Sequence, residues 1–264
     1  MRQIAVMLLV LVVAAPAAYA GPPLITDDAG TVEVGRLELE LDGATGFDHD
    51  RDAGGTIDRS STDTLLKVST GLYRDLGLAV SLPYTASARV RQGDQLISNV
   101  DGFGDTLVEL KYDVARLAGI TFALKPALLA PTGRYGAGLS EGRWQFGSTL
   151  IATREFNDGA YALHANLGYW HHSYRTEEAR AANRGDLWSG SLAGEARLLA
   201  GLTAVADVGL ATTQDTSTSE LSAYALTGLR YAVSDHLDLD AGIKVGLTKP
   251  VDDISLLYGL VIKF

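Results

Sequence analysis

The chain has 264 residues, a formal net charge of −10 at pH 7, 29 glycines and no cysteine. The acidic balance argues against a nucleic-acid partner, because phosphates demand a basic surface, and the lack of cysteine excludes disulfides and a lipid-modified cysteine. After residue 20 no stretch approaches the ~20 consecutive apolar residues of a membrane-spanning helix, so any spanning structure must be a closed barrel of strands.

The first twenty residues have the pattern of a secretory signal. Arg2 supplies a positive charge, residues 4–13 form an uncharged apolar stretch, and residues 18–20 (Ala-Tyr-Ala) give a small-x-small cleavage pattern. We therefore expect residues 1–20 to be a signal peptide that is cleaved on export. Residues 21–34 contain two prolines and two adjacent aspartates, which suit neither a strand nor a helix. They are expected to form a periplasmic N-terminal segment that tucks into a barrel mouth, where it is an available plug.

From residue 35 onward, apolar and polar side chains alternate with a period of two. Leu37, Leu39 and Leu41 alternate with Glu38, Glu40 and Asp42. In a strand this places apolar residues on one face and polar residues on the other. The pattern recurs and predicts twelve strands, at residues 37–42, 66–73, 78–90, 105–112, 120–128, 144–155, 161–172, 188–198, 202–210, 223–231, 237–247 and 254–264.

The connections between these strands alternate in length. Polar loops are predicted at residues 48–63, 91–103, 131–143, 174–186 and 212–220, and short turns lie between them. A membrane meander gives this asymmetry when every second end faces the cell exterior, whereas a soluble sandwich or barrel, the alternative, has no reason for it. The sequence therefore predicts an all-β, antiparallel, up-and-down transmembrane barrel of twelve strands over residues 35–264, in the outer membrane of a Gram-negative bacterium.

Aromatic residues collect near the predicted strand ends, which is typical of the two membrane interfaces. They are Tyr73, Tyr84, Tyr112, Trp144, Phe146, Tyr161, Tyr169, Trp188, Tyr231 and Phe264. The last strand resembles the closing strand of bacterial outer-membrane barrels, whose aromatic ending is read by the insertion machinery. Its predicted insertion signal is Tyr258, Leu260, Ile262 and Phe264. The expected partners are thus outer-membrane lipid and the barrel-insertion machinery.

Charged residues on the polar face are predicted to line the lumen. These candidates are Glu38, Glu40, Lys67, Glu109, Lys111, Lys125, His164, Asp207, Arg230, Asp238, Asp240 and Lys244, and Arg89 joins them on the same argument. Their mixed signs leave two roles open, because neighbours can satisfy one another in the wall or can select solutes. Twelve strands lie between small filled barrels and wide porins, so either a narrow passage or a plugged interior is expected.

Several stretches resemble bacterial outer-membrane proteins grouped as a transporter family labelled phenol meta-pathway degradation protein. They are residues 22–41, 101–114, 130–144, 163–169 and 223–248. The resemblance implies a barrel that passes small molecules, such as aromatic or hydrophobic compounds, and it assigns no functional residue. Gly104 and Asp105, within one of these stretches, are interpreted as a turn at a strand start. For a hydrophobic solute, Gly168 and Gly190 are candidates for a kink that permits lateral exit.

An outer-membrane enzyme and a structural surface barrel are the alternatives to a channel. His171 and Ser173 share the outward face of one strand, which is similar to the His-x-Ser of outer-membrane phospholipase, with Asn183 as a conceivable orienting residue. The surrounding residues do not otherwise follow that pattern. The predicted loops are modest, which disfavours an adhesive surface barrel. No enzyme activity, metal site or cofactor is therefore expected.

Overall fold

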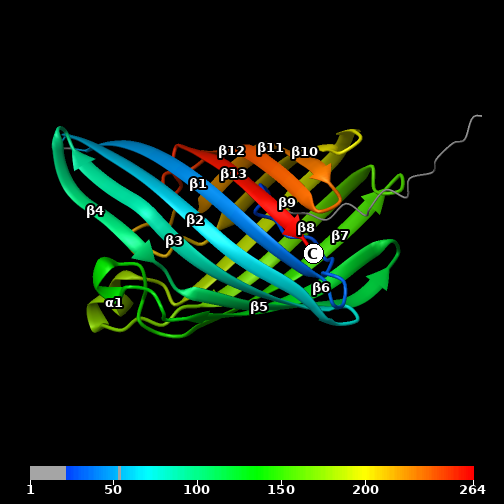
Figure 1. Cartoon of the computed structure of the whole chain (residues 1–264). Coiled ribbons are helices and arrows are strands. Elements are labelled where there is room, and N and C mark those ends of the chain that lie inside the picture. The colour runs from blue at the N-terminus through cyan, green and yellow to red at the C-terminus, as the bar shows by residue number, and fades with distance from the viewer. Residues whose placement is uncertain (1–21, 53–54) are drawn as a thin grey trace, which may run out of the picture.

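The computed structural model describes residues 22–52 and 55–264. The predicted signal peptide, residues 1–20, lies outside them. Most described residues belong to one antiparallel sheet, accompanied by a 3-10 turn at Tyr135–Ala137 and a short helix, α1 (Glu177–Ala182) (Figure 1). The strands are β1 (Leu37–Asp52), β2 (Gly55–Tyr73), β3 (Leu76–Gln92), β4 (Gln95–Phe103), β5 (Thr106–Leu117), β6 (Ile120–Ala130), β7 (Gln145–Phe156), β8 (Tyr161–His171), β9 (Asp186–Leu199), β10 (Leu202–Ala211), β11 (Ser222–Ser234), β12 (Leu237–Gly246) and β13 (Ile254–Lys263).

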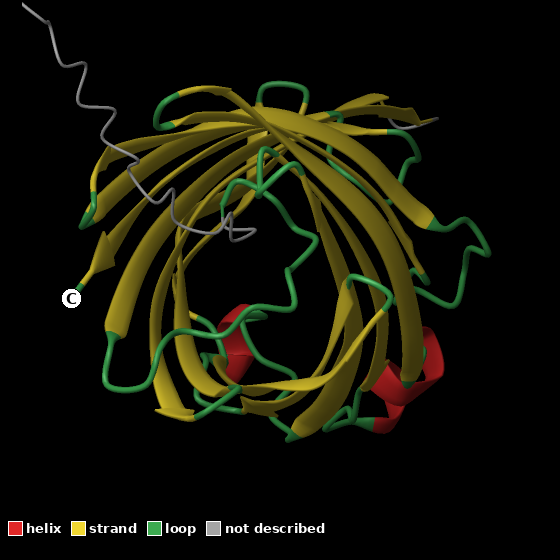
Figure 2. Cartoon of the chain, turned by 90° about the vertical axis from the view of Figure 1, so that its right-hand side faces the viewer, coloured by secondary structure: helices red, strands yellow, loops and turns green. Residues whose placement is uncertain are grey.

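The sheet closes into a barrel because its last strand pairs with its first. β13 lies between β12 and β1, with Leu260 opposite Leu239 on one side and Leu41 on the other. β2 pairs with both β1 and β3, which completes the circuit. Figure 2 shows the closed wall from one end. Among the described strands, each one except β4, which pairs with β3 alone, therefore has a partner on both sides over much of its length, as a bilayer requires.

The strands fill twelve places in the barrel, because β4 and β5 share one place. β4 pairs with the C-terminal half of β3, where Phe103 lies opposite Tyr84. β5 pairs with the other half, where Leu107 lies opposite Ser81. The predicted twelve-stranded antiparallel barrel is confirmed.

Two stretches predicted as loops are strands. Residues 48–52 continue β1 and residues 55–63 begin β2, and the two stretches pair as a ribbon, while residues 91–103 complete the β3–β4 hairpin. The side-chain alternation ends where contact with lipid ends, whereas backbone pairing needs no apolar face. The prediction was wrong here because it used side chains alone. The other connections alternate in length as predicted, which defines a short-turn end and a long-loop end of the barrel.

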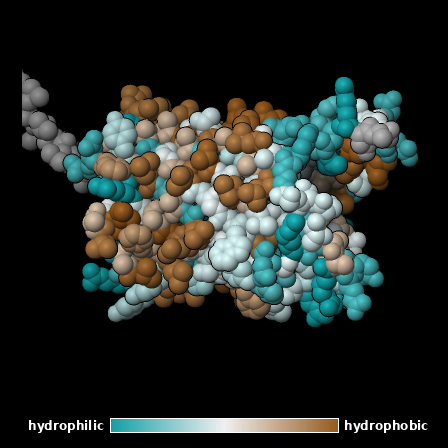
Figure 3. Space-filling model, turned by 180° about the vertical axis from the view of Figure 1, so that it is seen from behind, coloured by the Kyte–Doolittle hydropathy of each residue, from teal (hydrophilic) through white to brown (hydrophobic). Residues whose placement is uncertain are grey.

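The barrel is apolar outside and polar inside. Leu239 and Ile243 expose 43% and 46% of their surface, whereas Glu40 and Asp207 expose 8% and 2%. Apolar residues cover much of the outer wall, and polar residues gather toward the long-loop end, at the right of the view (Figure 3). A water-soluble protein buries its large apolar residues, so this arrangement fits a lipid environment. No helix within residues 22–52 and 55–264 is long and apolar enough to cross a membrane.

Ile243→Arg should lower the free energy of unfolding in phospholipid vesicles by about 2–4 kcal/mol, because a charge on the lipid face must leave water. Urea titration, followed by the heat-dependent mobility of the barrel on gels, measures the change. Lys244→Arg, one residue away on the inner face, is the control and should leave the stability nearly unchanged. Equal destabilisation by both substitutions would contradict the assigned faces.

Candidate functional site

A stretch of chain before β1 lies inside the barrel. We call residues 22–34 the inner segment. It leaves the wall at the short-turn end, where Val34 pairs with Gly71, and crosses the interior (Figure 2). Farther along it reaches Asp207 of β10, and Pro23 lies beside Gly228 of β11. The sequence placed this stretch at the barrel mouth, and the structure places it deep in the lumen.

The deepest anchor of the inner segment is a buried carboxylate. Asp207 Oδ2 accepts hydrogen bonds from the backbone N–H groups of Ile25 at 2.9 Å and Thr26 at 2.7 Å. Its Oδ1 accepts from the Thr26 hydroxyl at 2.8 Å and from the Tyr224 hydroxyl at 3.1 Å. Thr26 Oγ1 also lies 2.7 Å from Oγ of Ser191. A buried charge is tolerated only with such partners, so Asp207 and the segment need each other.

Two lysines of the wall hold the next residue, Asp27. The ammonium groups of Lys111 and Lys125 lie 2.8 and 2.9 Å from its carboxylate oxygens, and Lys111 also donates to the Asp28 carbonyl at 3.0 Å. Burial alone would raise the pKa of Asp27, but the positive charges of Lys111 and Lys125 outweigh it and hold that pKa below its usual range. Burial raises the pKa of the adjacent Asp28 to about 6, because the charge of Lys111 opposes this rise only in part and the negative charge of Asp27 adds to it.

The middle of the inner segment docks on β6, β7 and β8. Ala29 packs against Ala123 and Ile151, which face each other across the β6–β7 pair. Its backbone N–H donates to Oγ1 of Thr153 at 2.9 Å, and that oxygen lies 3.0 Å from Nδ1 of the buried His164. This small patch is the apolar part of an otherwise polar docking surface.

Glycines let the inner segment lie directly on the wall. A Cβ at Gly71 would overlap the backbone carbonyl oxygens of Val32 and Glu33. A Cβ at Gly228 would lie 2.6 Å from Cγ of Pro23, closer than real Cβ contacts come. Both ends of the segment therefore fit against backbone where no side chain intervenes.

The inner segment leaves a pocket at the short-turn end. It has a volume of about 470 Å³ and lies between residues 28–34 of the inner segment and residues of β2, β5, β6 and β7. Acidic and basic side chains line it, among them Asp113, Arg116 and Glu155. The segment thus separates this polar vestibule from the part of the lumen near the long loops.

A family model described as "Putative MetA-pathway of phenol degradation" matches residues 25–264, a span that includes most of the inner segment. The chain belongs to this family. A search of curated protein sequences gave no match.

Three solved structures show the same type of barrel as this family member. An outer membrane channel from Pseudomonas putida F1 has a TM-score of 0.72 and 16% identity, covering 90% of this chain and 98% of that chain. The NanC porin has a TM-score of 0.57 and 12% identity, with coverages of 86% and 100%. The translocator domain of the autotransporter NalP from Neisseria meningitidis has a TM-score of 0.53 and 11% identity, with coverages of 87% and 88%. At such identities the likeness concerns the fold alone.

Of the predicted lumen residues, the structure brings four to the inner segment. Lys111, Lys125 and Asp207 contact it directly, and His164 does so through Thr153. Glu109 supports Lys125 at 3.0 Å. The sequence did not single out Thr153, Ser191, Tyr224 and Glu195, which also lie at inward positions. Thr153, Ser191 and Tyr224 are uncharged, so only their place in the alternation could have predicted them, whereas the charge of Glu195 on an inward position was a further signal.

The other predicted lumen residues belong to the wall. Lys67 pairs with Glu40 at 3.0 Å, and Asp238 pairs with Lys263 at 2.7 Å. Arg230 pairs with the buried Glu195 at 2.6 Å. In the described chain, no hydrogen bond or ion pair joins the remaining predicted residues to the inner segment; they are Glu38, Asp240 and Lys244. Opposite charges on neighbouring strands therefore satisfy one another in much of the wall.

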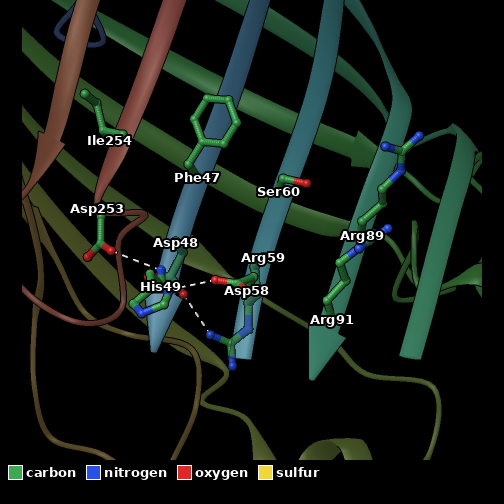
Figure 4. A pocket seen from close by; sticks show the side chains of 10 residues that line it. All are labelled: Phe47, Asp48, His49, Asp58, Arg59, Ser60, Arg89, Arg91, Asp253 and Ile254. Atoms are coloured by element: carbon green, nitrogen blue, oxygen red, sulfur yellow. Dashed lines mark hydrogen bonds and ion pairs between the residues drawn. The ribbon is translucent and has the colours of Figure 1, made fainter. Parts of the chain in front are cut away.

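The prediction that Arg89 faces the lumen is wrong. The pairing of β2 with β3 shifts by one residue near Thr62, so Arg89 lies opposite Ser60 and shares the outer face with Phe47. A bulge reverses the faces of a strand beyond it. Arg89 instead borders a rim pocket of about 350 Å³ at the long-loop end, where His49 Nδ1 lies 2.6 Å from Asp58 Oδ1 (Figure 4).

Asp105 has a structural role at the start of β5, in line with its interpretation as a turn feature. Its buried carboxylate accepts a hydrogen bond from the Gly133 N–H at 2.8 Å and one from the Ser140 hydroxyl at 3.0 Å. It thereby holds residues 131–143 against the junction of β4 and β5. The predicted kink at Gly168 and Gly190 is not found, because the β8–β9 pairing runs through both without a shift.

The phospholipase-like grouping does not assemble as the sequence alternative required. Nδ1 of His171 lies 2.9 Å from Asp186, and the side chain of Asn183 donates to the Ala179 carbonyl within α1. Within residues 22–52 and 55–264, no hydrogen bond joins Ser173 to His171. The alternative therefore gains no support.

Asp207→Ala should release the inner segment, because it removes the acceptor of three hydrogen bonds from Ile25 and Thr26. Since the chain has no cysteine, Ala29→Cys provides a single thiol whose reaction with a water-soluble maleimide reports undocking. Losing hydrogen bonds to a charged group should speed this reaction about tenfold or more. Asp240→Ala removes an inner-wall carboxylate that does not bind the segment and should leave the rate unchanged. Equal maleimide reaction rates in the Asp207→Ala and Asp240→Ala variants would show that Asp207 is not the anchor.

Proposed function

We propose that the protein is a passive outer-membrane channel or transporter for small molecules, and that the inner segment is its plug. In this proposal residues 1–20 direct export, the short-turn end faces the periplasm and the long-loop end faces the exterior. The observation that carries it is the bonding of Thr26 and Asp27 to Asp207, Lys111 and Lys125 inside a closed barrel. A barrel with no need for a controlled lumen could fill its interior with its own side chains.

The chemistry of the docking surface suits a plug that moves. Its contacts are mainly hydrogen bonds and ion pairs, and its buried apolar part is the patch of Ala29, Ala123 and Ile151. A hydrogen bond exchanged for one with water contributes only about 0.5–1.5 kcal/mol net. Ordering the backbone of one residue costs about 1–2 kcal/mol. The bound and released states are therefore close enough in free energy for a solute or the membrane environment to shift the balance.

Family membership supports small aromatic or hydrophobic compounds as the solutes. The family description names phenol degradation, and phenol is a small aromatic molecule. For a hydrophobic compound, the barrier to diffusion is the polar lipopolysaccharide of the outer leaflet and not the acyl layer. A protein passage through that leaflet would therefore speed its entry. We infer that the solute enters from the long-loop end and that the inner segment must yield before it reaches the periplasm.

Deleting residues 22–34 from the mature protein should raise the single-channel conductance several-fold in planar bilayers and should allow liposomes to swell in small neutral sugars. In a matched variant, a Gly/Ser sequence of equal length replaces residues 22–34. This variant distinguishes the effect of the hydrogen bonds and ion pairs of the plug from the effect of its volume. It should also conduct more than the natural protein, because it lacks Thr26 and Asp27. A deletion variant that folds and conducts no better than the natural protein would refute the plug.

We also propose that the closing strand recruits the barrel-insertion machinery. Phe264 exposes 59% of its surface, and its backbone N–H bonds the Leu37 carbonyl at 2.8 Å beside the closing seam. Its ring is thus available to a partner while its backbone helps close the barrel. Tyr258, Leu260 and Ile262 occupy the same face.

Phe264→Ala should reduce the amount of folded barrel in the outer membrane severalfold, measured by heat-dependent gel mobility, because the ring that the machinery recognises is lost. Leu199→Ala, which removes an exposed apolar side chain at the end of β9, is the control and should assemble normally. Unaided refolding of purified Phe264→Ala into vesicles should remain efficient. A refolding defect as large as the defect in cells would instead assign Phe264 to barrel stability.

A further inference from the structure

One tryptophan lies apart from the others. The chain has three, and Trp144 and Trp188 expose 52% and 55% of their surface. Trp188 lies opposite Tyr169 on the outer face, as expected of a membrane-interface residue. Trp170 follows Tyr169 and therefore points inward, where it is partly exposed. A large aromatic side chain in a lumen lined mainly by charges needs an explanation.

The wall is shaped to receive the indole of Trp170. Gly147 lies opposite it on β7, and a Cβ at Gly147 would overlap the Cδ2 and Cε2 atoms of the indole. The ring therefore lies directly against the β7 backbone. Since one side of the ring meets the wall, the exposed remainder of the residue faces the lumen.

The neighbours of Trp170 are aromatic or apolar. The ring of His172 lies 6.1 Å from the indole in an edge-on arrangement, and Tyr174 stacks behind His172 at 6.4 Å. Leu187 lies opposite Trp170 on β9 and shares its inward face. Burial lowers the pKa of His172, and the neighbouring His171 adds to the effect, which favours the neutral imidazole. This part of the wall presents rings without a net charge.

These rings lie on the long-loop side of the inner segment. On β8 the side-chain amide of Asn166 lies against the backbone N and O of Asp27, at 2.7 and 2.9 Å. Asn166 is four residues before Trp170 and so about 13 Å nearer the short-turn end. The lysines and carboxylates that bind the inner segment are grouped at the same depth in the barrel as Asn166. A solute entering between the long loops would meet the rings of Trp170 and His172 before it meets the docked segment.

We propose that Trp170, His172 and Leu187 form a stacking subsite for a planar aromatic solute. The indole supplies a flat apolar face, and the edge-on imidazole borders it as a second wall. Stacked aromatic rings attract one another beyond the effect of burying area, which favours a flat solute over a puckered one of equal size. Weak binding suits this place, because a solute in a passage must be able to leave again.

The subsite rests on the proposed function for its purpose, but its binding can be measured without transport. Trp144→Phe with Trp188→Phe leaves Trp170 as the sole tryptophan. Titration of this variant in detergent with 4-nitrobenzoate should give saturable fluorescence quenching that benzoate relieves and cyclohexanecarboxylate does not. The matched variant Trp144→Phe with Trp170→Leu retains only Trp188 and should show linear, collisional quenching.

A further substitution tests the second ring. In the variant with Trp170 alone, His172→Ala should raise the half-saturating concentration of 4-nitrobenzoate about threefold or more. Heat-dependent gel mobility confirms that each variant is folded before titration. Linear quenching of Trp170, or equal competition by benzoate and cyclohexanecarboxylate, would overturn the subsite. Saturable quenching in a protein whose plug deletion leaves conductance unchanged would instead uphold the subsite and reject the channel.

Discussion

The structure depends on one constraint, which is that a bilayer offers no water to an unpaired backbone group. A sheet can meet that constraint only by closing on itself. The seam between β13 and β1 provides the closure, with ten consecutive residue pairs from Glu38–Lys263 to Phe47–Ile254. Once the wall is closed, its two faces have different solvents. The same alternation of side chains therefore gives an oily exterior and a polar interior.

Closure around twelve places also creates the problem that the inner segment solves. Inward carboxylates such as Asp207 are shielded from water by the wall, and a shielded charge is costly without partners. The wall meets part of the need by itself, as in the pairs Lys67–Glu40 and Arg230–Glu195. Asp207, Lys111 and Lys125 take partners from residues 25–28 instead. Under the proposed function, those partners leave together with the inner segment, and water or a solute takes their place.

The aromatic residues divide in the same way between two environments. Trp144 and Trp188 lie on the outer surface, where an amphipathic ring suits the membrane interface. Trp170 uses the same kind of ring on the opposite face, over Gly147, where it faces the lumen. On β8, Tyr169 lies on the outer face beside Trp188, and Trp170, the next residue, lies on the inner face. A bulge has a comparable effect on β3, where it moves Arg89 from the predicted lumen to the outer rim.

The sequence by itself determined the barrel, its twelve strands and the sense of its faces, because a period of two records which solvent each side chain meets. It also predicted Lys111, Lys125, His164 and Asp207 as lumen residues. Only the tertiary structure decided that residues 22–34 bind deep inside, because their partners come from strands distant in the chain and no local pattern encodes that meeting. It likewise decided where strands continue beyond the lipid, where a bulge reverses a face, and that Gly147 makes room for Trp170. Those outcomes follow from backbone register, which side-chain periodicity alone does not fix.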